Sequence, residues 1–272
     1  MSWKDLEKGS YLSHTQIAMY RRCPLQYMFR YMKGIKKPPT SSLVLGSSVH
    51  TSVEKNIGHK FEKGKPVNRN EAMDAFGQAF ENGKSGIDWE GKNPDAVKDM
   101  GYNMSQVHYD KVAPTITPVE KPEFYFELNL DGVTRKVIGY IDVIAKAGAG
   151  RAVLDTKTTG KKKDQFEVDL DGQLTLYAIA HKTLFKKPAK MLGMDVLVGN
   201  KTWVQPQRII TTRGDEQMTA MVETVQAIEK AIMAGIFYPC DSKMICSWCG
   251  YSDICPSAKA AKAIYLAKKE AE

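Results

Sequence analysis

Two aspartates and one lysine lie on predicted strands where their side chains could share a site. Asp142 follows the mostly apolar segment 139–141, and a single residue, Thr156, separates Asp155 from Lys157. Because side chains alternate in direction along a strand, Asp155 and Lys157 are expected on the same face. The spacing therefore predicts an acidic and a basic group directed at one point.

The two aspartates belong to strands that a glycine-rich turn at 148–150 joins, so Asp142 and Asp155 should be neighbours. Paired carboxylates repel each other unless a cation lies between them, and Mg²⁺ or Mn²⁺ suits oxygen ligands. His50, on a predicted helix one turn before Glu54, adds a third ligand and favours tolerance of Mn²⁺. Lys157 would then lie near an attacking water or a developing phosphate charge. Together these residues predict metal-assisted hydrolysis of a phosphodiester, although each alone has an ordinary structural explanation.

Five cysteines suggest a second kind of site. Four of the five fall within the last 33 residues, and an odd count argues against a framework of disulfides. Cys246, Cys249 and Cys255 form a compact triplet that leaves one position open in a four-thiolate site, for which Cys23 and Cys240 compete. Cys240 is favoured by its short separation from the triplet. Zinc and an iron–sulfur cluster both accept four thiolates, and free thiols are the third interpretation.

The elements that must position these residues follow from periodicity and caps. Ser13 is the expected N-cap of a first helix that Pro24 disturbs, and Asn93 that of a helix beginning at Pro94. Further helices are expected over 43–56, 70–82, 172–187 and 215–234. Strands are expected over 124–130, 135–145, 152–157, 191–198 and 204–211. This order predicts an α/β fold with a mixed central sheet and flanking helices.

Composition narrows the class of protein. The 272 residues are 43% hydrophobic and 26% charged, which excludes a disordered or fibrous chain. No apolar run approaches the ~20 residues of a membrane span, and the N-terminus lacks a secretory signal, so a cytoplasmic location is expected. The net charge of +8 suggests a polyanionic partner. No Walker-type phosphate loop is present, so the chain is not itself a helicase.

From residue 13 to residue 256 the sequence resembles the RecB-type branch of the PD-(D/E)xK nuclease superfamily. That branch includes CRISPR-adaptation-associated nucleases and the nuclease domain of the AddB helicase subunit. Cys23, Pro24 and Tyr27 match the Cys-Pro-x-x-Tyr run of its opening helix. Six further residues fall on family motif positions: His50, Asp142, Asp155, Lys157, Gln173 and Tyr177. Asp155 is a departure, because the family often has Glu there.

The resemblance implies roles for these residues. His50, Asp142 and Asp155 would bind the metal, with the carbonyl of Thr156 as a further ligand. Lys157 would be the catalytic lysine. Two residues of the helix at 172–187, Gln173 and Tyr177, would orient groups or contact DNA. Glu54 is expected as a partner of His50 or of a metal-bound water.

The resemblance also favours a [4Fe–4S] cluster over zinc, held by Cys23, Cys246, Cys249 and Cys255, with a structural role. It implies the restriction-endonuclease-like core in one domain, 1–272. That domain would have a helical part at 1–113, a catalytic sheet at 120–211 and a C-terminal helix with the cluster loop at 215–272, which closes onto the first helix.

The leading hypothesis is a Mg²⁺- or Mn²⁺-dependent deoxyribonuclease, an exonuclease rather than an endonuclease, that acts on single-stranded DNA or duplex ends. Recombination or CRISPR-adaptation proteins would be its partners, with no role for a membrane. One alternative is a DNA-end-binding recombination or repair accessory protein with a vestigial nuclease site. Another is a zinc-stabilised nucleic-acid-binding protein without catalysis. Four aromatic residues could stack DNA bases or pack the core: Tyr20, Tyr27, Phe29 and Tyr31.

Overall fold

The computed structural model describes residues 10–200 and 202–270, with side chains up to residue 263. The chain divides into two compact units. Unit 1 consists of Met1–Lys37, Asn129–Ile138 and Ala220–Glu272, and unit 2 consists of Pro38–Leu128 and Gly139–Thr219. Each unit therefore combines segments far apart in the sequence. The single domain and its three parts, expected from the sequence, stay a prediction. The boundaries of the two units differ from the boundaries of those three parts.

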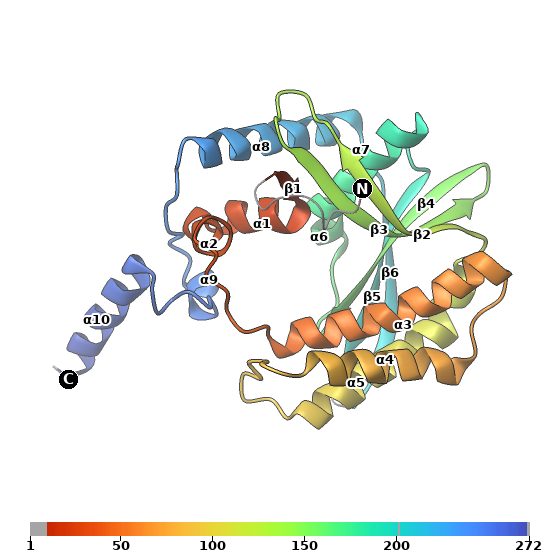
Figure 1. The fold of residues 1–272 in the computed structure, drawn as a ribbon, viewed down its shortest axis with the longest axis horizontal. Coiled ribbons are helices and arrows are strands. Elements are labelled where there is room, and N and C mark those ends of the chain that lie inside the picture. Colours follow the sequence, from red (N-terminus) through yellow and green to blue (C-terminus); the bar gives the residue numbers. More distant parts are fainter. Residues whose placement is uncertain (1–9, 201, 271–272) are drawn as a thin grey trace. The chain divides into compact units, whose positions relative to one another are not determined.

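A mixed sheet forms the centre of unit 2 (Figure 1). Its strands are β2 (Val119–Leu128), β3 (Lys136–Ala147), β4 (Gly150–Thr159), β5 (Met191–Gly199) and β6 (Val204–Thr211), in that spatial order. The β3–β4 and β5–β6 pairs are antiparallel, and the β4–β5 pair is parallel. The mixed sheet with flanking helices confirms the predicted α/β fold.

Helices cover both faces of this sheet. The bounds are α3 (Ser41–Lys63), α4 (Arg69–Gly83), α5 (Pro94–Val107), η3 (His108–Val112), η4 (Ala113–Thr115), α6 (Gln165–Asp169) and α7 (Gly172–Phe185). Gly46 of α3 approaches the side chain of Thr158 on β4, whereas Tyr177 of α7 reaches Asp155 on the same strand. Because alternate residues of a strand face opposite sides, α3 and α7 lie on opposite faces of β4.

Local signals explain most of the element boundaries. Asn93 caps α5 as predicted, with its side chain accepting hydrogen bonds from the first turn. The helix expected over 70–82 begins one residue earlier, at Arg69, because Asn68 is the N-cap of α4. Helix α3 continues beyond the predicted end at 56, since Ile57 still packs in the core and Gly64 ends the helix with φ of 70°.

Unit 1 contains β1 (Tyr11–Ser13), α1 (His14–Arg22), α2 (Pro24–Tyr27), η2 (Met28–Met32), most of α8 (Asp215–Met233), α9 (Lys243–Ser247) and α10 (Pro256–Glu270). Ser13 caps α1 as predicted. Strand β1, which sequence patterns did not predict, pairs in parallel with the first residues of β3. Buried Glu229 of α8 accepts hydrogen bonds from the backbone of Thr134 and Arg135. Among the described residues, no helix is both long and apolar enough to span a membrane.

Candidate active site

The structure brings the predicted acidic residues of β3 and β4 together in unit 2. Val143 pairs with Leu154 across the two strands, which places Asp142 and Asp155 at the next position of the ladder. One carboxylate oxygen of Asp142, Oδ2, accepts the backbone N–H of Thr156 at 2.8 Å. The same oxygen lies 3.7 Å from Nδ1 of His50, which α3 supplies. Three separate elements therefore contribute to one small region.

Lys157 belongs to a closed ring of hydrogen bonds in the same region. Its ammonium group donates to Oδ1 of Asp155 at 3.1 Å and to Oε1 of Gln173 at 2.8 Å. Gln173 in turn donates to the hydroxyl of Tyr177 at 2.6 Å, and Tyr177 donates to Asp155 at 3.5 Å. Because Gln173 and Tyr177 are four residues apart on α7, they present one helix face to β4. The ring fixes the position of the ammonium group.

Burial controls the charges of this ring. Asp155 is 1% exposed, and burial together with the negative charge of Asp142 raises its pKa to about 7, against the attraction of Lys157. Burial acts to lower the pKa of Lys157, but Asp155 and Asp142 outweigh it and raise that pKa above its ordinary value. The lysine therefore stays cationic, while burial and the neighbouring Asp142 disfavour the ionised form of Asp155.

The donor set fits a hard divalent cation. Oδ2 of Asp155 is buried and accepts no hydrogen bond, although the ammonium group of Lys157 lies 2.9 Å away. A buried oxygen that no donor satisfies, beside a second carboxylate and an imidazole, matches the oxygen and nitrogen ligands of Mg²⁺ or Mn²⁺. Within the described part of the chain, however, no group of three or more His, Cys, Asp or Glu residues is already arranged to hold a metal ion.

Glu123 is an acidic residue of this region that the sequence analysis missed. Burial raises its pKa to about 8, and the charges of Asp142, Glu54 and Asp155 act in the same direction. Its backbone has φ of 41°, in the left-handed region, although it lies inside β2 and carries a side chain. Such strain often occurs at functional sites. The available signal was Pro122, which directly precedes Glu123 just before the strand expected over 124–130.

Glu54 lies near Glu123, because its negative charge helps to raise the pKa of that residue. A cavity of about 430 Å³ lies between α3, α4 and β2 and is lined by both Glu54 and Glu123. The role of Glu54 as a partner of His50 or of a metal-bound water stays a prediction.

The five cysteines gather in unit 1. Cys23, Cys249 and Cys255 pack in one cluster with Phe29 and Tyr251. Sγ of Cys240 lies 3.9 Å from Sγ of Cys246, and none of the five cysteines forms a disulfide. Burial raises the pKa of the Cys246 thiol to about 11, with further contributions from Cys240, Cys249 and Cys23. A set of free, adjacent thiols matches a soft-metal or iron–sulfur site by donor type, and both candidates for the fourth ligand are present.

The aromatic residues of the first helices pack inside unit 1. Tyr20, Tyr27 and Phe29 are at most 6% exposed, so their interpretation as base-stacking residues was wrong and the core-packing alternative is confirmed. The exposed rings of this unit include Tyr238 and Trp248, each 58% exposed. The guanidinium of Arg22 lies 5.6 Å from the ring centre of Trp248.

Comparisons with known proteins identify the family of the chain. A protein of Mycobacterium phage D29, "Gene 69 protein", is 25% identical to the chain over 272 residues, which covers 91% of this chain and 97% of that protein. A solved structure named "Putative exonuclease" from Eubacterium rectale shares the fold with a TM-score of 0.53 and 13% identity, over 89% of this chain and 91% of that one. The family model of the PD-(D/E)XK nuclease superfamily matches residues 11–256. The chain therefore belongs to the PD-(D/E)XK nuclease superfamily.

Proposed function

We propose that this protein is a Mg²⁺- or Mn²⁺-dependent DNA exonuclease whose site is formed by His50, Asp142, Asp155 and Lys157. The observation that carries the proposal is the buried carboxylate of Asp155 beside that of Asp142, with Oδ2 of Asp155 accepting no hydrogen bond. Lys157 provides one positive charge for these two carboxylates. A bound divalent cation would supply the remaining positive charge and so offset the cost of burying them.

In this proposal, His50, Asp142 and Asp155 hold the metal ion, with the carbonyl of Thr156 as a further ligand. A bound ion of this kind lowers the pKa of its water and polarises the scissile phosphate. Lys157 then stabilises negative charge on the phosphate or orients the water, as a donor fixed in advance.

Two neighbours of Lys157 keep it in position. Gln173 accepts one of its ammonium hydrogens, and Tyr177 holds both Gln173 and Asp155. Both residues therefore act on the position of the ammonium group rather than on the phosphate. Glu123, whose pKa is raised by burial and by the charges of nearby acidic residues, adds a further carboxyl group that the cation would help to ionise.

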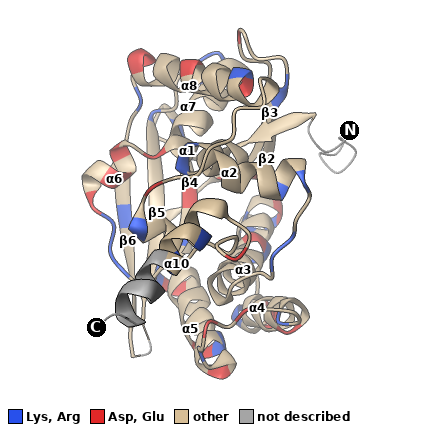
Figure 2. Cartoon of the chain, turned by 90° about the vertical axis from the view of Figure 1, so that its left-hand side faces the viewer, with Lys and Arg blue, Asp and Glu red and all other residues tan. Residues whose placement is uncertain are grey.

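Basic residues near the site support an anionic polymer as substrate. Figure 2 shows Lys and Arg on β6 and on the segment between β4 and α6. Lys161 and Lys162 of that segment are exposed, four and five residues after Lys157. Arg208 on β6 is partly neutralised by Asp195, to which it donates two hydrogen bonds. The name of the Eubacterium rectale protein, "Putative exonuclease", supports a preference for DNA ends.

We further propose that the thiols of Cys23, Cys246, Cys249 and Cys255 hold a structural [4Fe–4S] cluster. The adjacency of the cysteines and the absence of disulfides among them support this assignment. Its role would be to fasten the first helices to the C-terminal segment of unit 1.

Incubation with end-labelled DNA tests the proposed activity. Linear single- and double-stranded DNA should be degraded with Mg²⁺ or Mn²⁺ and should stay intact with EDTA. Covalently closed circular DNA, which has no ends, should resist degradation. Cleavage of the circles would identify an endonuclease. If no DNA were cleaved with either metal while DNA ends were still bound, the accessory-protein alternative would replace this proposal.

A further inference from the structure

Two tyrosine side chains are in contact on strands β2 and β3, close to the candidate active site. The ring centres of Tyr125 and Tyr140 are 5.2 Å apart. Tyr140 is 38% exposed and Tyr125 is half-buried, whereas Ile141, which follows Tyr140, is fully buried. The pair therefore presents aromatic surface to solvent on the strand that also carries Asp142.

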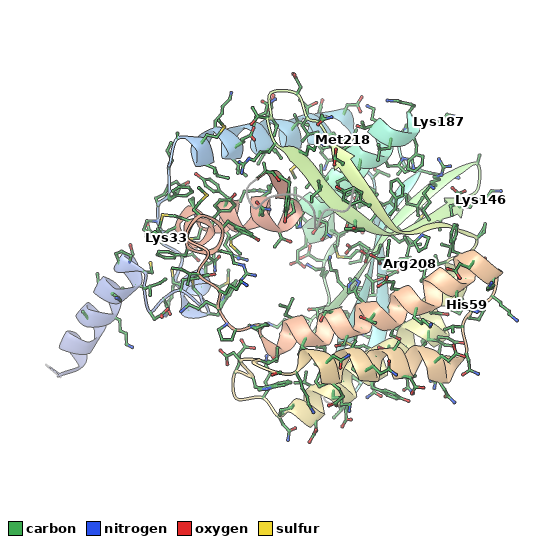
Figure 3. All side chains as sticks on the ribbon, in the orientation of Figure 1. Lys33, His59, Lys146, Lys187, Arg208 and Met218 are labelled. Atoms are coloured by element: carbon green, nitrogen blue, oxygen red, sulfur yellow. The ribbon has the colours of Figure 1, made fainter. Side chains whose placement is uncertain are left out.

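The neighbouring residues show which face of the two strands carries the tyrosine pair. Phe126 packs edge-to-face on Tyr177 of α7, and its ring lies over Gly139 of β3. Figure 3 shows that side chains extend from both faces of β2 and β3. Because successive side chains of a strand point to opposite faces, Tyr125 and Tyr140 point away from α7.

Asp142 connects the tyrosine pair to the proposed metal ligands. Tyr140 and Asp142 are two residues apart on β3, so they share a face and are separated by about 7 Å at ~3.4 Å per residue. His50 reaches Asp142 from α3, which covers the side of the sheet opposite α7. A separation of this size is comparable to the reach of one nucleotide. A base next to a phosphate at Asp142 would therefore come to lie at the tyrosine rings.

The chemistry around the tyrosine pair suits a base better than a phosphate. The hydroxyl of Tyr125 donates a hydrogen bond to Glu127 at 3.3 Å. Burial and the negative charge of Glu127 raise the pKa of Tyr125, so its hydroxyl stays neutral. The carboxylate of Glu127 repels a phosphate at this position. An aromatic ring, by contrast, stacks on any base, because every base has a π-face.

We propose that Tyr140, supported by Tyr125, stacks on the base next to the scissile phosphate, so that the substrate strand enters the site unpaired. In a duplex the faces of each base are covered by its neighbours, and a base must leave the stack before it can contact a protein ring. The proposal rests on the proposed nuclease function and adds the form of DNA that the site accepts. The competing explanation is that the aromatic pair only stabilises the two strands.

Cleavage of single-stranded DNA by the full-length protein with Mn²⁺, at low DNA concentration, tests the contact. Tyr140→Thr removes the ring but keeps a residue that favours strands, and it should lower the cleavage rate at least about tenfold. Tyr140→Phe keeps the ring and should cleave like the wild type. Tyr102→Ala is the matched control, because Tyr102 is 40% exposed but packs on Phe76 of α4. This control should also cleave like the wild type.

Changes in the substrate distinguish stacking from a structural role of the tyrosine pair. An abasic residue on one side of the cleaved bond should slow the wild type by a similar factor, and there Tyr140→Thr should add little. The wild type should also cleave single-stranded DNA at least about tenfold faster than a blunt duplex of the same sequence. In EDTA, 2-aminopurine at the abasic-sensitive position should lose fluorescence when the wild type binds, but not when Tyr140→Thr binds.

Three results would overturn the proposal. The first is wild-type cleavage of abasic and intact DNA at equal rates, whichever side of the bond lacks its base. The second is an equal slowing of intact and abasic DNA by Tyr140→Thr, and the third is equal cleavage of single strands and blunt duplexes. If the wild type cleaved no DNA, the proposed function would fail instead. Fluorescence of 2-aminopurine placed at each terminal position would then still decide whether Tyr140 stacks on a base.

Discussion

At the scale of single residues, the carboxyl groups of Glu123 and Asp155 make the stability of the folded protein depend on pH. Burial raises the pKa of Glu123 from 4.5 to about 8 and that of Asp155 from 3.8 to about 7. Between the unfolded and folded values, the folded protein keeps protons that the unfolded chain has released. The free energy of unfolding therefore falls as pH rises between the unfolded and folded pKa values. A bound cation that favours the ionised form of both groups in the folded protein would remove this loss of folding stability.

We therefore predict that, in EDTA, the free energy of unfolding of the wild type falls as pH rises from about 5 to about 8. Glu123→Gln should make this fall shallower, because Gln cannot titrate. Exposed Glu71 on α4 provides the control, and Glu71→Gln should leave the slope unchanged. Denaturant titrations across this pH range measure the slope. An identical slope for Glu123→Gln and the wild type would show that Glu123 is not buried among carboxylates.

At the scale of elements, Arg213 fastens α7 to the end of β6. Its buried guanidinium donates to five acceptors: Thr175 Oγ1, Thr211 Oγ1 and the carbonyls of Val168, Asp171 and Thr212. Asp171 is the N-cap of α7, and Gln173 follows it on the first turn. The position of Gln173, and through it that of Lys157, therefore depends on Arg213. We infer that Arg213 is a positioning residue for the proposed reaction.

Arg213→Lys should lower kcat about tenfold while KM for DNA changes little, because lysine keeps the charge but cannot satisfy all five acceptors. In a Gln173→Ala background the same substitution should cost much less, since Arg213 acts through Gln173. Single-turnover kinetics of the four proteins in this cycle measure the coupling. An equal loss of kcat in both backgrounds would show that Arg213 stabilises the fold and does not act through Gln173.

The elements near the site were predictable because their signals are local. Helix α7 was expected over 172–187 and runs from Gly172 to Phe185, since its apolar spacing and cap lie within its own sequence. The shared face of Asp155 and Lys157 follows from strand alternation in the same way.

Features that depend on distant residues were not predictable. The three-residue strand β1 pairs with Lys136–Ile138, more than 100 positions later in the chain, and carries no period of its own. Glu123 has a φ of 41°, so the regular alternation of a strand does not predict the direction of its side chain. The contacts of Arg213 join the loop after β6 to both ends of the segment between α6 and α7. No pattern within a short window encodes such contacts.

At the scale of the whole molecule, unit 1 is assembled from three segments that lie far apart in the sequence. Cys23 precedes α2, whereas the other cysteines lie after residue 239. A four-thiolate cluster that includes Cys23 would close a loop of more than 200 residues. By analogy with disulfides, such a closure stabilises the fold by a few kcal/mol.

Cys23→Ser should therefore lose iron and lower the thermal unfolding midpoint, whereas Cys240→Ser should retain both. Cys240→Ser is the informative control, because Cys240 is the competing candidate for the fourth ligand and its sulfur lies 3.9 Å from that of Cys246. Anaerobic purification, iron assay and visible absorption distinguish the variants. Colourless Cys240→Ser protein together with iron-loaded Cys23→Ser protein would show that the cluster is held by the C-terminal segment alone.

The most direct test of the account is DNA cleavage by Asp155→Asn and Lys157→Ala at saturating Mn²⁺. Both variants should lose at least about 10²-fold in rate, as expected when a charge-stabilising group of an active site is removed. Both variants should remain folded and should bind DNA about as tightly as the wild type. Asp99→Asn and Lys65→Ala, at exposed positions outside the ring and away from the basic segment after β4, are the matched controls and should cleave normally. Cleavage at the wild-type rate by either Asp155→Asn or Lys157→Ala would contradict the assignment of the active site.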